Sequence, residues 1–348
     1  MSGNPQKAVT IVIANYNGRA LLEKYLPHAV AAADYYSFDT EIIVVDDASI
    51  DDSVAYLEKH HPSVRVIRHA VNLGFGRASD TGIRAARNPV VILLNTDVCV
   101  REDFIAPLVS HFAADDVFAV MAMSLREDGH TPGELVKVPF FKRGYLKFVS
   151  SENADLQKVV SENDGFPSYS FYAVGGHCAL DRAKYFELKG FDELYYPFYF
   201  EDVDLCYRGW KRGWKTIFEP RSIVYHYHDS GSIRSKHREA YIGNIIRRNR
   251  LLFVWKNITS PRYFCLNHLL PVLFRSIAGI FVLDVSFLRA LFGALRRLPL
   301  ALKRRKEEKL QERILSDEEI FKLILSGSKS FKKELLHEVG ASASILDQ

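Results

Sequence analysis

The sequence predicts an α/β protein with a doubly wound, mostly parallel sheet and a helical, basic C-terminal region. Over the first hundred residues, short apolar runs rich in Val, Ile and Leu alternate with segments of helical spacing. The runs are continuously apolar, which is typical of strands covered by helices on both faces. From about residue 235 onward, helical spacing with Arg and Lys replaces the strand signals.

This alternation gives the order of the predicted elements. Strands are expected at residues 9–14, 41–45, 64–68 and 90–94. Helices are expected at residues 18–33, 51–60 and 75–87, the second of them opening with acidic residues that suit its positive end. Residues 125–170 are polar and irregular, which favours loops with a short strand or two. Further strands are expected at residues 171–180, 215–219 and 223–227.

Composition and charge bound the domain organisation. The chain has 348 residues, 48% hydrophobic and 25% charged, so it can bury a sizeable core. The net charge of +4 is uneven: residues 241–348 hold 19 Lys and Arg against 10 Asp and Glu, and the preceding part holds 27 against 32. We expect one domain at residues 1–235, with halves at 1–100 and 101–235, and a helical region at 236–348.

Cysteine usage and the termini favour a cytoplasmic protein. The four cysteines are scattered without CxxC spacing, which is typical of reduced, mostly buried thiols. The N-terminus leads straight into a strand and lacks the layout of a signal peptide. No charge-free apolar run reaches the ~18 residues expected of a membrane span, so we expect no transmembrane helix.

Polar side chains follow several of the predicted strands. Residues 15–17, 46–47 and 95–97 lie at strand ends, where ligands bind in open α/β sheets. A third acidic cluster, at residues 201–204, directly follows an aromatic run at 198–200. These acids also suit a helix start, but carboxylates beside an apolar run are costly without a partner or a reaction. The pattern favours one site that holds a metal and a phosphate, with a spare carboxylate as base.

Together these segments resemble the inverting GT-A glycosyltransferases of family 2, in the rhamnosyltransferase-like branch that builds bacterial surface polysaccharides. The resemblance covers roughly residues 8–235 and depends on the order and spacing of short motifs. They are Val12-Ile13-Ala14-Asn15-Tyr16-Asn17-Gly18, Val44-Val45-Asp46-Asp47, Asn72-Leu73-Gly74-Phe75-Gly76, Leu94-Asn95-Thr96-Asp97, Gly190-Phe191-Asp192-Glu193 and Phe200-Glu201-Asp202-Val203-Asp204.

The resemblance implies a GT-A fold whose first half binds a nucleotide-sugar donor. An acid at Asp46 would accept from the nucleobase or ribose, and Asp47 would share this contact; a turn is the alternative for both. Ala14 and Tyr16 would flank the base, unless Tyr16 packs in the core. Arg77, at the start of a helix, would pair with phosphate, or it is a surface residue.

The resemblance also implies a divalent cation, Mg²⁺ or Mn²⁺. Asn95 and Asp97 match the family's DxD motif with its first acid replaced by Asn. Asp97 would bind the metal and bridge it to the donor diphosphate. A histidine after the last strand of the domain would complete the coordination, with His226 preferred and His228 as the alternative.

The acceptor half would supply the base. Inversion by one displacement needs a carboxylate beside the acceptor hydroxyl, and Asp202 is the candidate. Glu201 would hydrogen-bond the acceptor, and Asp204 is the less favoured base because it lies on another side of the helix. Gly175 and Gly176 would form an acceptor-side strand that allows close approach of the sugar.

The basic C-terminal region predicts a membrane partner. Apolar residues at helical spacing and cationic residues on the other side extend over residues 281–306, as in helices that lie on anionic membranes. The alternative is a helix packed on the catalytic domain or at a homodimer contact. No reader motif accompanies the charge, so nucleic acid is not expected.

The predicted function is therefore metal-dependent, inverting sugar transfer to a saccharide or lipid-linked acceptor in cell-surface polysaccharide synthesis. The enzyme would be cytoplasmic and peripherally attached to the inner face of the plasma membrane. Two alternatives are a sugar-nucleotide-forming nucleotidyltransferase and a non-catalytic, membrane-associated sugar-binding protein. The first would place a basic glycine-rich loop after the first strand, where this chain has Asn15-Tyr16-Asn17-Gly18.

Overall fold

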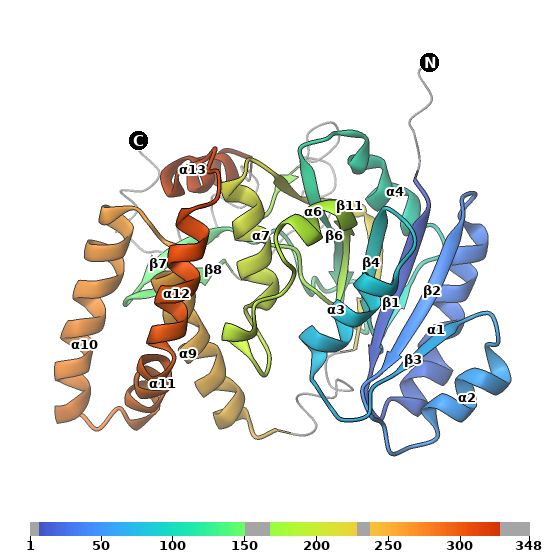
Figure 1. Cartoon of the computed structure of the whole chain (residues 1–348), viewed down its shortest axis with the longest axis horizontal. Helices are drawn as coiled ribbons and strands as arrows, with labels where there is room; N and C mark the ends of the chain where they lie inside the picture. Colours follow the sequence, from blue (N-terminus) through green and yellow to red (C-terminus); the bar gives the residue numbers. More distant parts are fainter. Residues whose placement is uncertain (1–6, 150–167, 228–236, 328–348) are drawn as a thin grey trace.

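The structure, a computed structural model, describes residues 7–149, 168–227 and 237–327 (Figure 1). Its centre is a mixed sheet whose first half is parallel. In spatial order from the edge, these strands are β3 (Arg65–Arg68), β2 (Thr40–Asp46), β1 (Val9–Asn15) and β4 (Val90–Asn95). All four confirm the predicted strands, and their carboxyl ends meet at one edge of the sheet.

The second half of the sheet contains antiparallel pairs. In spatial order it continues with β10 (His177–Asp181), β6 (Val117–Leu125), β11 (Lys215–His226) and β5 (Val98–Val100), and β9 (Ser168–Tyr169) pairs with β11. The strand predicted at 171–180 is shorter than expected, because residues 171–176 are irregular. The two strands predicted at 215–219 and 223–227 are one strand with a register shift. The fully buried β6 was not predicted.

Helices cover both faces of the sheet, as the continuous apolar strands predicted. One core contains side chains of α1 (Arg19–Tyr35), α2 (Ser53–His60) and α4 (Ile105–Ser110). The other contains side chains of α3 (Phe75–Ala85), α6 (Arg182–Glu187) and α7 (Glu201–Lys211). Helix α3 lies so close to β1 that a Cβ at Gly82 would overlap the Val12 side chain.

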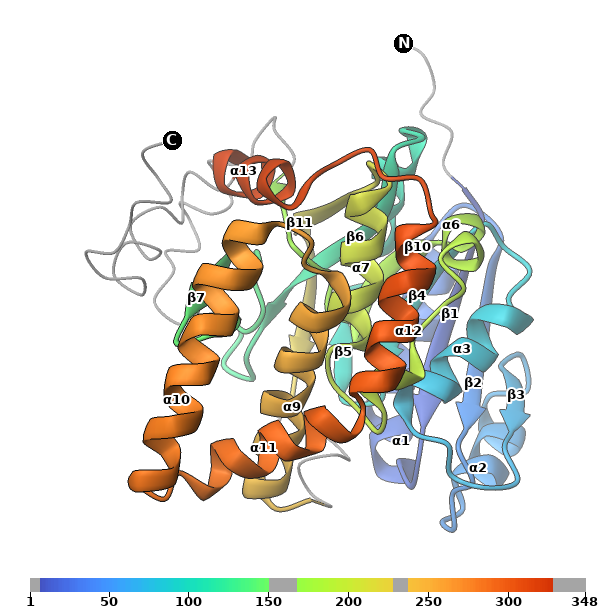
Figure 2. The same ribbon diagram turned by 60° about the vertical axis from the view of Figure 1, so that its left-hand side comes forward.

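The C-terminal helices gather on the side opposite β1–β3 (Figures 1 and 2). They are α9 (Glu239–Asn257), the π-helical η4 (Arg262–Leu269), α10 (Leu270–Phe281), α11 (Val285–Arg296), α12 (Leu298–Lys309) and α13 (Asp317–Gly327). A third apolar core joins α9, α11 and α13 to α7 and to the hairpin β7 (Pro139–Lys142)–β8 (Tyr145–Phe148).

This arrangement corrects the single amphipathic helix predicted at residues 281–306. The segment forms two helices, α11 and α12, separated at Arg297. Phe287 and Ala294 of α11 and Ala301 of α12 are buried in the third core. Part of the apolar spacing in this segment therefore reflects packing within the protein, whereas Phe292 and Leu295 of α11 are exposed.

The exposed apolar surface lies instead on η4, α10, the turn that follows and the first residue of α11. Its exposed side chains are Leu266, Leu269, Leu270, Leu273, Phe274, Ile277, Ile280, Phe281, Val282, Leu283 and Val285. The helix Arg262–Phe281 is long and apolar enough to cross a membrane, and only 17% of its most apolar window is buried. The expectation of no transmembrane helix depended on charge-free runs, and Arg275 interrupts this segment, so the helix is a candidate membrane span by length and composition only.

Buried charges join the C-terminal helices to α7. Lys256 of α9 is 1% exposed, and its Nζ lies 2.7 Å from carboxylate oxygens of both Asp192 and Asp204. Asp204 is fully buried and also accepts from Arg208 Nε at 2.8 Å and from Asn257 Nδ2 at 2.8 Å. Because every charge has an opposite partner, the cluster can exist in the interior.

We predict that Lys256→Met lowers the free energy of unfolding by about 3–5 kcal/mol, because methionine fills the space of the lysine stem but leaves two buried carboxylates undercompensated. Chemical denaturation of the full chain measures the change. Lys309→Met, at an exposed position in the last turn of α12, is the control and should change stability little. A loss below about 1 kcal/mol, the range of surface pairs, would show that the cluster does not anchor α9.

Candidate active site

A cavity of about 690 Å³ lies at the carboxyl ends of β1 and β4 and reaches across to the start of α7 and to α9. Most of the residues predicted to bind ligands line it. They are Ala14, Tyr16, Asp47, Asn95, Asp97, Gly175, Gly176, Glu201, Asp202 and His226. Asp46 and Arg77 do not line it. The fold therefore gathers side chains that are far apart in the sequence into one cavity.

The two acids after β2 have different surroundings. Asp46 is 1% exposed and accepts hydrogen bonds from Asn15 Nδ2 at 2.9 Å and from the Ser49 N–H at 3.1 Å. Asp47 accepts from the N–H groups of Leu73 and Gly74, and its Oδ1 lies 2.7 Å from His69 Nδ1. Asp47 thus holds the loop before α3 in place. Asp46 does not line the cavity itself but accepts a hydrogen bond from Asn15, which does.

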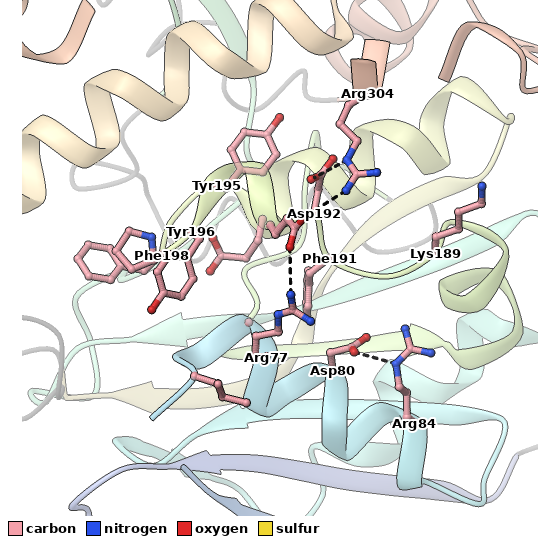
Figure 3. A pocket seen from close by; sticks show the side chains of 15 residues that line it. Arg77, Asp80, Arg84, Lys189, Phe191, Asp192, Tyr195, Tyr196, Phe198 and Arg304 are labelled. Atoms are coloured by element: carbon pink, nitrogen blue, oxygen red, sulfur yellow. Dashed lines mark hydrogen bonds and ion pairs between the residues drawn. The ribbon is translucent and has the colours of Figure 1, made fainter. Parts of the chain in front are cut away.

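The start of α3 presents its backbone, not its arginine, to the cavity. Gly74 has φ +83°, a conformation that favours glycine, and Gly74 and Phe75 line the cavity. Arg77 lines a smaller neighbouring cavity and pairs with Glu193 at 3.1 Å (Figure 3). The N-terminus of α3 therefore remains the candidate contact for phosphate, whereas Arg77 is directed elsewhere.

Asp97 and His226 come together from different parts of the chain. Asp97 follows β4, His226 ends β11, and His226 Nε2 lies 3.3 Å from Asp97 Oδ1. A carboxylate oxygen and an imidazole nitrogen on one cavity wall fit a cation such as Mn²⁺ or Mg²⁺. No group of three or more His, Cys, Asp or Glu suited to a metal occurs within residues 7–149, 168–227 and 237–327. The remaining ligands would therefore be substrate phosphates and water, and His228 lies outside the described residues.

Neighbouring residues support this pair. Burial lowers the pKa of His177 to about 3, and its ring lies 5.8 Å from that of His226. A neutral His177 adds no positive charge beside a bound cation. A Cβ at Gly176 would come within 2.5 Å of Asn95 Nδ2, so glycine at this position leaves room for the Asn95 side chain. Glycine at position 176 is therefore explained locally, because any larger residue would collide with the Asn95 side chain.

A strained turn positions the carboxylates at the start of α7. Tyr199 and Phe200 have φ of 68° and 81°, conformations that non-glycine residues rarely adopt. Asn249 of α9 stabilises this turn by donating to the carbonyls of Phe198 at 3.1 Å and Tyr199 at 2.7 Å. The turn directs the side chains of the next two residues, Glu201 and Asp202, toward the cavity.

The two carboxyl groups differ in their hydrogen bonds. Asp202 accepts from the N–H groups of Gly175 at 3.1 Å and Val203 at 2.8 Å, which fixes its orientation. Burial raises the pKa of Asp202, and these two donors oppose part of the rise. Burial and then the Asp202 carboxylate raise the pKa of Glu201 to about 8. At neutral pH Glu201 is therefore the protonated partner, and Asp202 is the better base.

Three features of the cavity were not predicted. Arg248 of α9 and Arg297 after α11 line it, and so does Glu134, whose carboxylate pairs with Lys137. The only sequence signal for the arginines was the general basic charge of the C-terminal region, which does not identify individual residues. Asp204, by contrast, points into the buried charge cluster, as its predicted place on another side of α7 implies.

Comparison with known proteins agrees with this geometry. Residues 10–173 match the model of the family Glycosyl transferase family 2. The chain carries a family 2 glycosyltransferase domain. The matched segment contains nearly all of β1, the whole of β2–β4, and both Asp46 and Asp97, so the predicted resemblance is confirmed.

Relatives of this family 2 glycosyltransferase domain include a rhamnosyltransferase and a succinoglycan biosynthesis protein. The N-acetylglucosaminyl-diphospho-decaprenol L-rhamnosyltransferase of Mycobacterium tuberculosis is 26% identical over 256 residues, covering 66% of this chain and 80% of that protein. The succinoglycan biosynthesis protein ExoO of Rhizobium meliloti is 31% identical over 206 residues, covering 50% of this chain and 58% of that protein.

A solved structure supports the GT-A fold. GalNAc-T7, crystallised with UDP, GalNAc and Mn²⁺, superposes with a TM-score of 0.58 at 20% identity. The match covers 92% of this chain and 56% of that one, so this chain spans little more than half of that protein. At this identity the likeness establishes the fold, and the predicted fold class is confirmed.

We predict that Mn²⁺ binding requires Asp97. Asp97→Ala should remove the protein-bound Mn²⁺ signal in electron paramagnetic resonance titrations carried out with a nucleoside diphosphate, because it deletes the carboxylate of a two-residue site. Asp103→Ala, at a carboxylate that pairs with Arg101 away from the cavity, is the control. Equal Mn²⁺ affinity of Asp97→Ala and the unmodified chain would exclude Asp97 as a ligand.

Proposed function

We propose that this chain transfers a sugar with inversion from a nucleotide-sugar donor to a saccharide or lipid-linked acceptor in cell-surface polysaccharide synthesis. One observation carries the proposal: an Asp202 carboxylate fixed by backbone donors lines the same cavity as the Asp97–His226 pair. The UDP and Mn²⁺ bound to GalNAc-T7, and the lipid diphosphate named in the mycobacterial rhamnosyltransferase, support the same substrate classes.

The reaction needs a base on the acceptor side. The acceptor oxygen attacks the anomeric carbon from the side opposite the diphosphate, and the bond between that carbon and the diphosphate oxygen breaks. The electron pair of that bond leaves with the nucleoside diphosphate, and the acceptor proton passes to Asp202. A divalent cation held by Asp97 and His226 would offset the negative charge of the leaving diphosphate.

Glu201 has a complementary role in this proposal. Its Oε2 is shielded from solvent and has no hydrogen-bond partner among the residues that the structure describes. With a pKa of about 8, the protonated carboxyl can donate one hydrogen bond to the acceptor and accept another. The two neighbours then divide the work: Glu201 orients the acceptor and Asp202 accepts its proton.

We predict different outcomes for two isosteric changes. Asp202→Asn should lower the transfer rate by ~10²-fold or more, because an amide cannot accept the proton. Glu201→Gln should keep most of the activity at pH 7, since glutamine resembles the protonated acid. Above pH about 8 the unmodified enzyme should lose activity as Glu201 ionises, whereas Glu201→Gln should not. Transfer rates measured from pH 6 to 9.5 test both, and a near-normal rate for Asp202→Asn would exclude it as the base.

The proposed membrane contact is the apolar surface of η4 and α10. Its inner face packs on the protein: His268 bridges Gly144 of the β7–β8 turn and Trp255 of α9 through hydrogen bonds. Helices α9 and α11, which flank this segment in the chain, also pack on each other, with Ser286 bonded to Asn244. This helix is therefore attached to the rest of the protein at both ends and along one face. Such attachment supports a helix that lies on the membrane surface and does not cross the membrane.

Cationic residues flank the same surface. Arg262 at the start of η4 and Arg289 and Arg296 on α11 are exposed. Each Lys or Arg near an anionic leaflet adds about 1 kcal/mol, and salt screens this attraction. Buried apolar side chains and these charges together favour peripheral attachment to the cytoplasmic face of the plasma membrane.

We predict that the full chain sediments with anionic liposomes and that the pair Phe274→Glu and Ile277→Glu abolishes binding. Both side chains are more than 60% exposed, so the changes remove membrane contact without opening the core. Tyr35→Glu, at a 60% exposed position at the end of α1, is the control. Undiminished sedimentation of the double variant would indicate attachment through another surface.

A further inference from the structure

Two arginines face the cavity from the C-terminal helices. Arg248 of α9 is 9% exposed, and Arg297 follows the last turn of α11. They are the cavity's only Lys or Arg residues in the described part of the chain. Both therefore place positive charge beside the reaction, although the chemistry proposed above uses neither.

The hydrogen bonds of this pair do not neutralise its charge. Arg248 donates to the Tyr196 carbonyl at 2.7 Å and to Asn249 Oδ1 at 2.9 Å. Arg297 donates to the Leu194 carbonyl at 2.8 Å. Within the described ranges, the hydrogen bonds of both arginines go to carbonyl and amide oxygens, and neither arginine forms an ion pair with a carboxylate. These hydrogen bonds fix the guanidinium groups and leave each charge without a paired carboxylate among the described residues.

The arginines that line the neighbouring, smaller cavity each pair with a carboxylate. There Arg77 pairs with Glu193, Arg84 with Asp80, and Arg304 with Asp192 (Figure 3). Two partly buried guanidinium groups without such partners are unfavourable, because burial and mutual repulsion oppose charge. Accordingly, burial and then Arg297 lower the pKa of Arg248 to about 10, so it remains charged at neutral pH.

The stem of Arg248 packs against α11. A Cβ at Gly293 of α11 would lie 3.4 Å from Arg248 Cδ, an ordinary contact distance. Asn249, next to Arg248, holds the turn before Glu201 and Asp202. The arginines are thus tied to the side of the cavity that carries the proposed base, whereas Asp97 and His226 come from the sheet.

We propose that Arg248 and Arg297 bind a phosphate or diphosphate group carried by the acceptor. The inference rests on the proposed function, which places the acceptor beside Asp202. Arginine suits phosphate because its planar fork of N–H donors matches the phosphate oxygens. Phe292 and Leu295, exposed on α11 just before Arg297, would accommodate the chain of a lipid-linked acceptor. A soluble phosphate-bearing glycan offers the same phosphate chemistry without the chain.

Calorimetric binding to the full chain in EDTA tests the proposal with three probes: farnesyl diphosphate, inorganic pyrophosphate and farnesol. Chelation removes metal-dependent phosphate binding at Asp97 and His226. We expect farnesyl diphosphate to bind and Arg297→Gln or Arg248→Gln to weaken it about tenfold or more, the scale of one charge-assisted contact. Arg248→Lys should retain part of the affinity. Arg289→Gln, at an exposed position of α11, should leave it unchanged.

The probes also identify the source of the phosphate. Arginine-dependent binding of pyrophosphate as tight as that of farnesyl diphosphate favours a soluble acceptor, and tighter farnesyl diphosphate binding favours a lipid-linked one. Three results overturn the proposal: no diphosphate binding, equal affinity of the Arg→Gln variants, or farnesol binding as tightly as farnesyl diphosphate. If the unmodified chain transferred no sugar, that result would contradict only the proposed function, because the binding assay requires no turnover.

Discussion

The buried cluster of Asp204, Arg208 and Lys256 is the interaction on which the rest of the site depends. It joins α7, which carries the proposed base, to α9, which contributes Arg248 to the same cavity. Isolated charges are costly inside a protein, and here each has an opposite partner within 2.8 Å. The cluster does not have to add much net stability to matter, because breaking it is costly and its contacts hold α9 in one register against α7.

That register has a direct consequence for catalysis. With α9 fixed by Lys256, Asn249 is placed to donate to the carbonyls of the strained turn at Tyr199 and Phe200. The turn in turn sets the directions of Glu201 and Asp202, and Gly175 and Val203 orient the Asp202 carboxylate. Strain at such a turn persists only where surrounding contacts hold it. The C-terminal helices therefore support the active site as well as covering it.

The same helices separate two kinds of surface. One face of η4 and α10 packs on the β7–β8 hairpin, and the other exposes a continuous set of Leu, Ile and Phe side chains. Helix α11 links this surface to the cavity, because Phe292 and Leu295 precede Arg297 by a few residues. An acceptor that joins a lipid to a sugar through phosphate would contact apolar, cationic and catalytic groups in that order. The membrane contact and the arginine pair are separate proposals with separate tests, and both are consistent with a lipid-linked acceptor.

Local patterns in the sequence determined the first half of the sheet, the strand-end position of Asp97 and the position of Asp202 at a helix start. These features depend on burial periodicity and on residues adjacent in the chain, which a sequence displays directly. Only the tertiary structure decided that Arg77 faces a second cavity, that Arg248 and Arg297 enter the main one, and that α10 exposes its apolar face. Each depends on packing between segments far apart in the chain, such as α9 against residues 194–200. Helical periodicity shows that a face is apolar, but whether protein or another partner covers it is set by contacts that the local pattern does not contain.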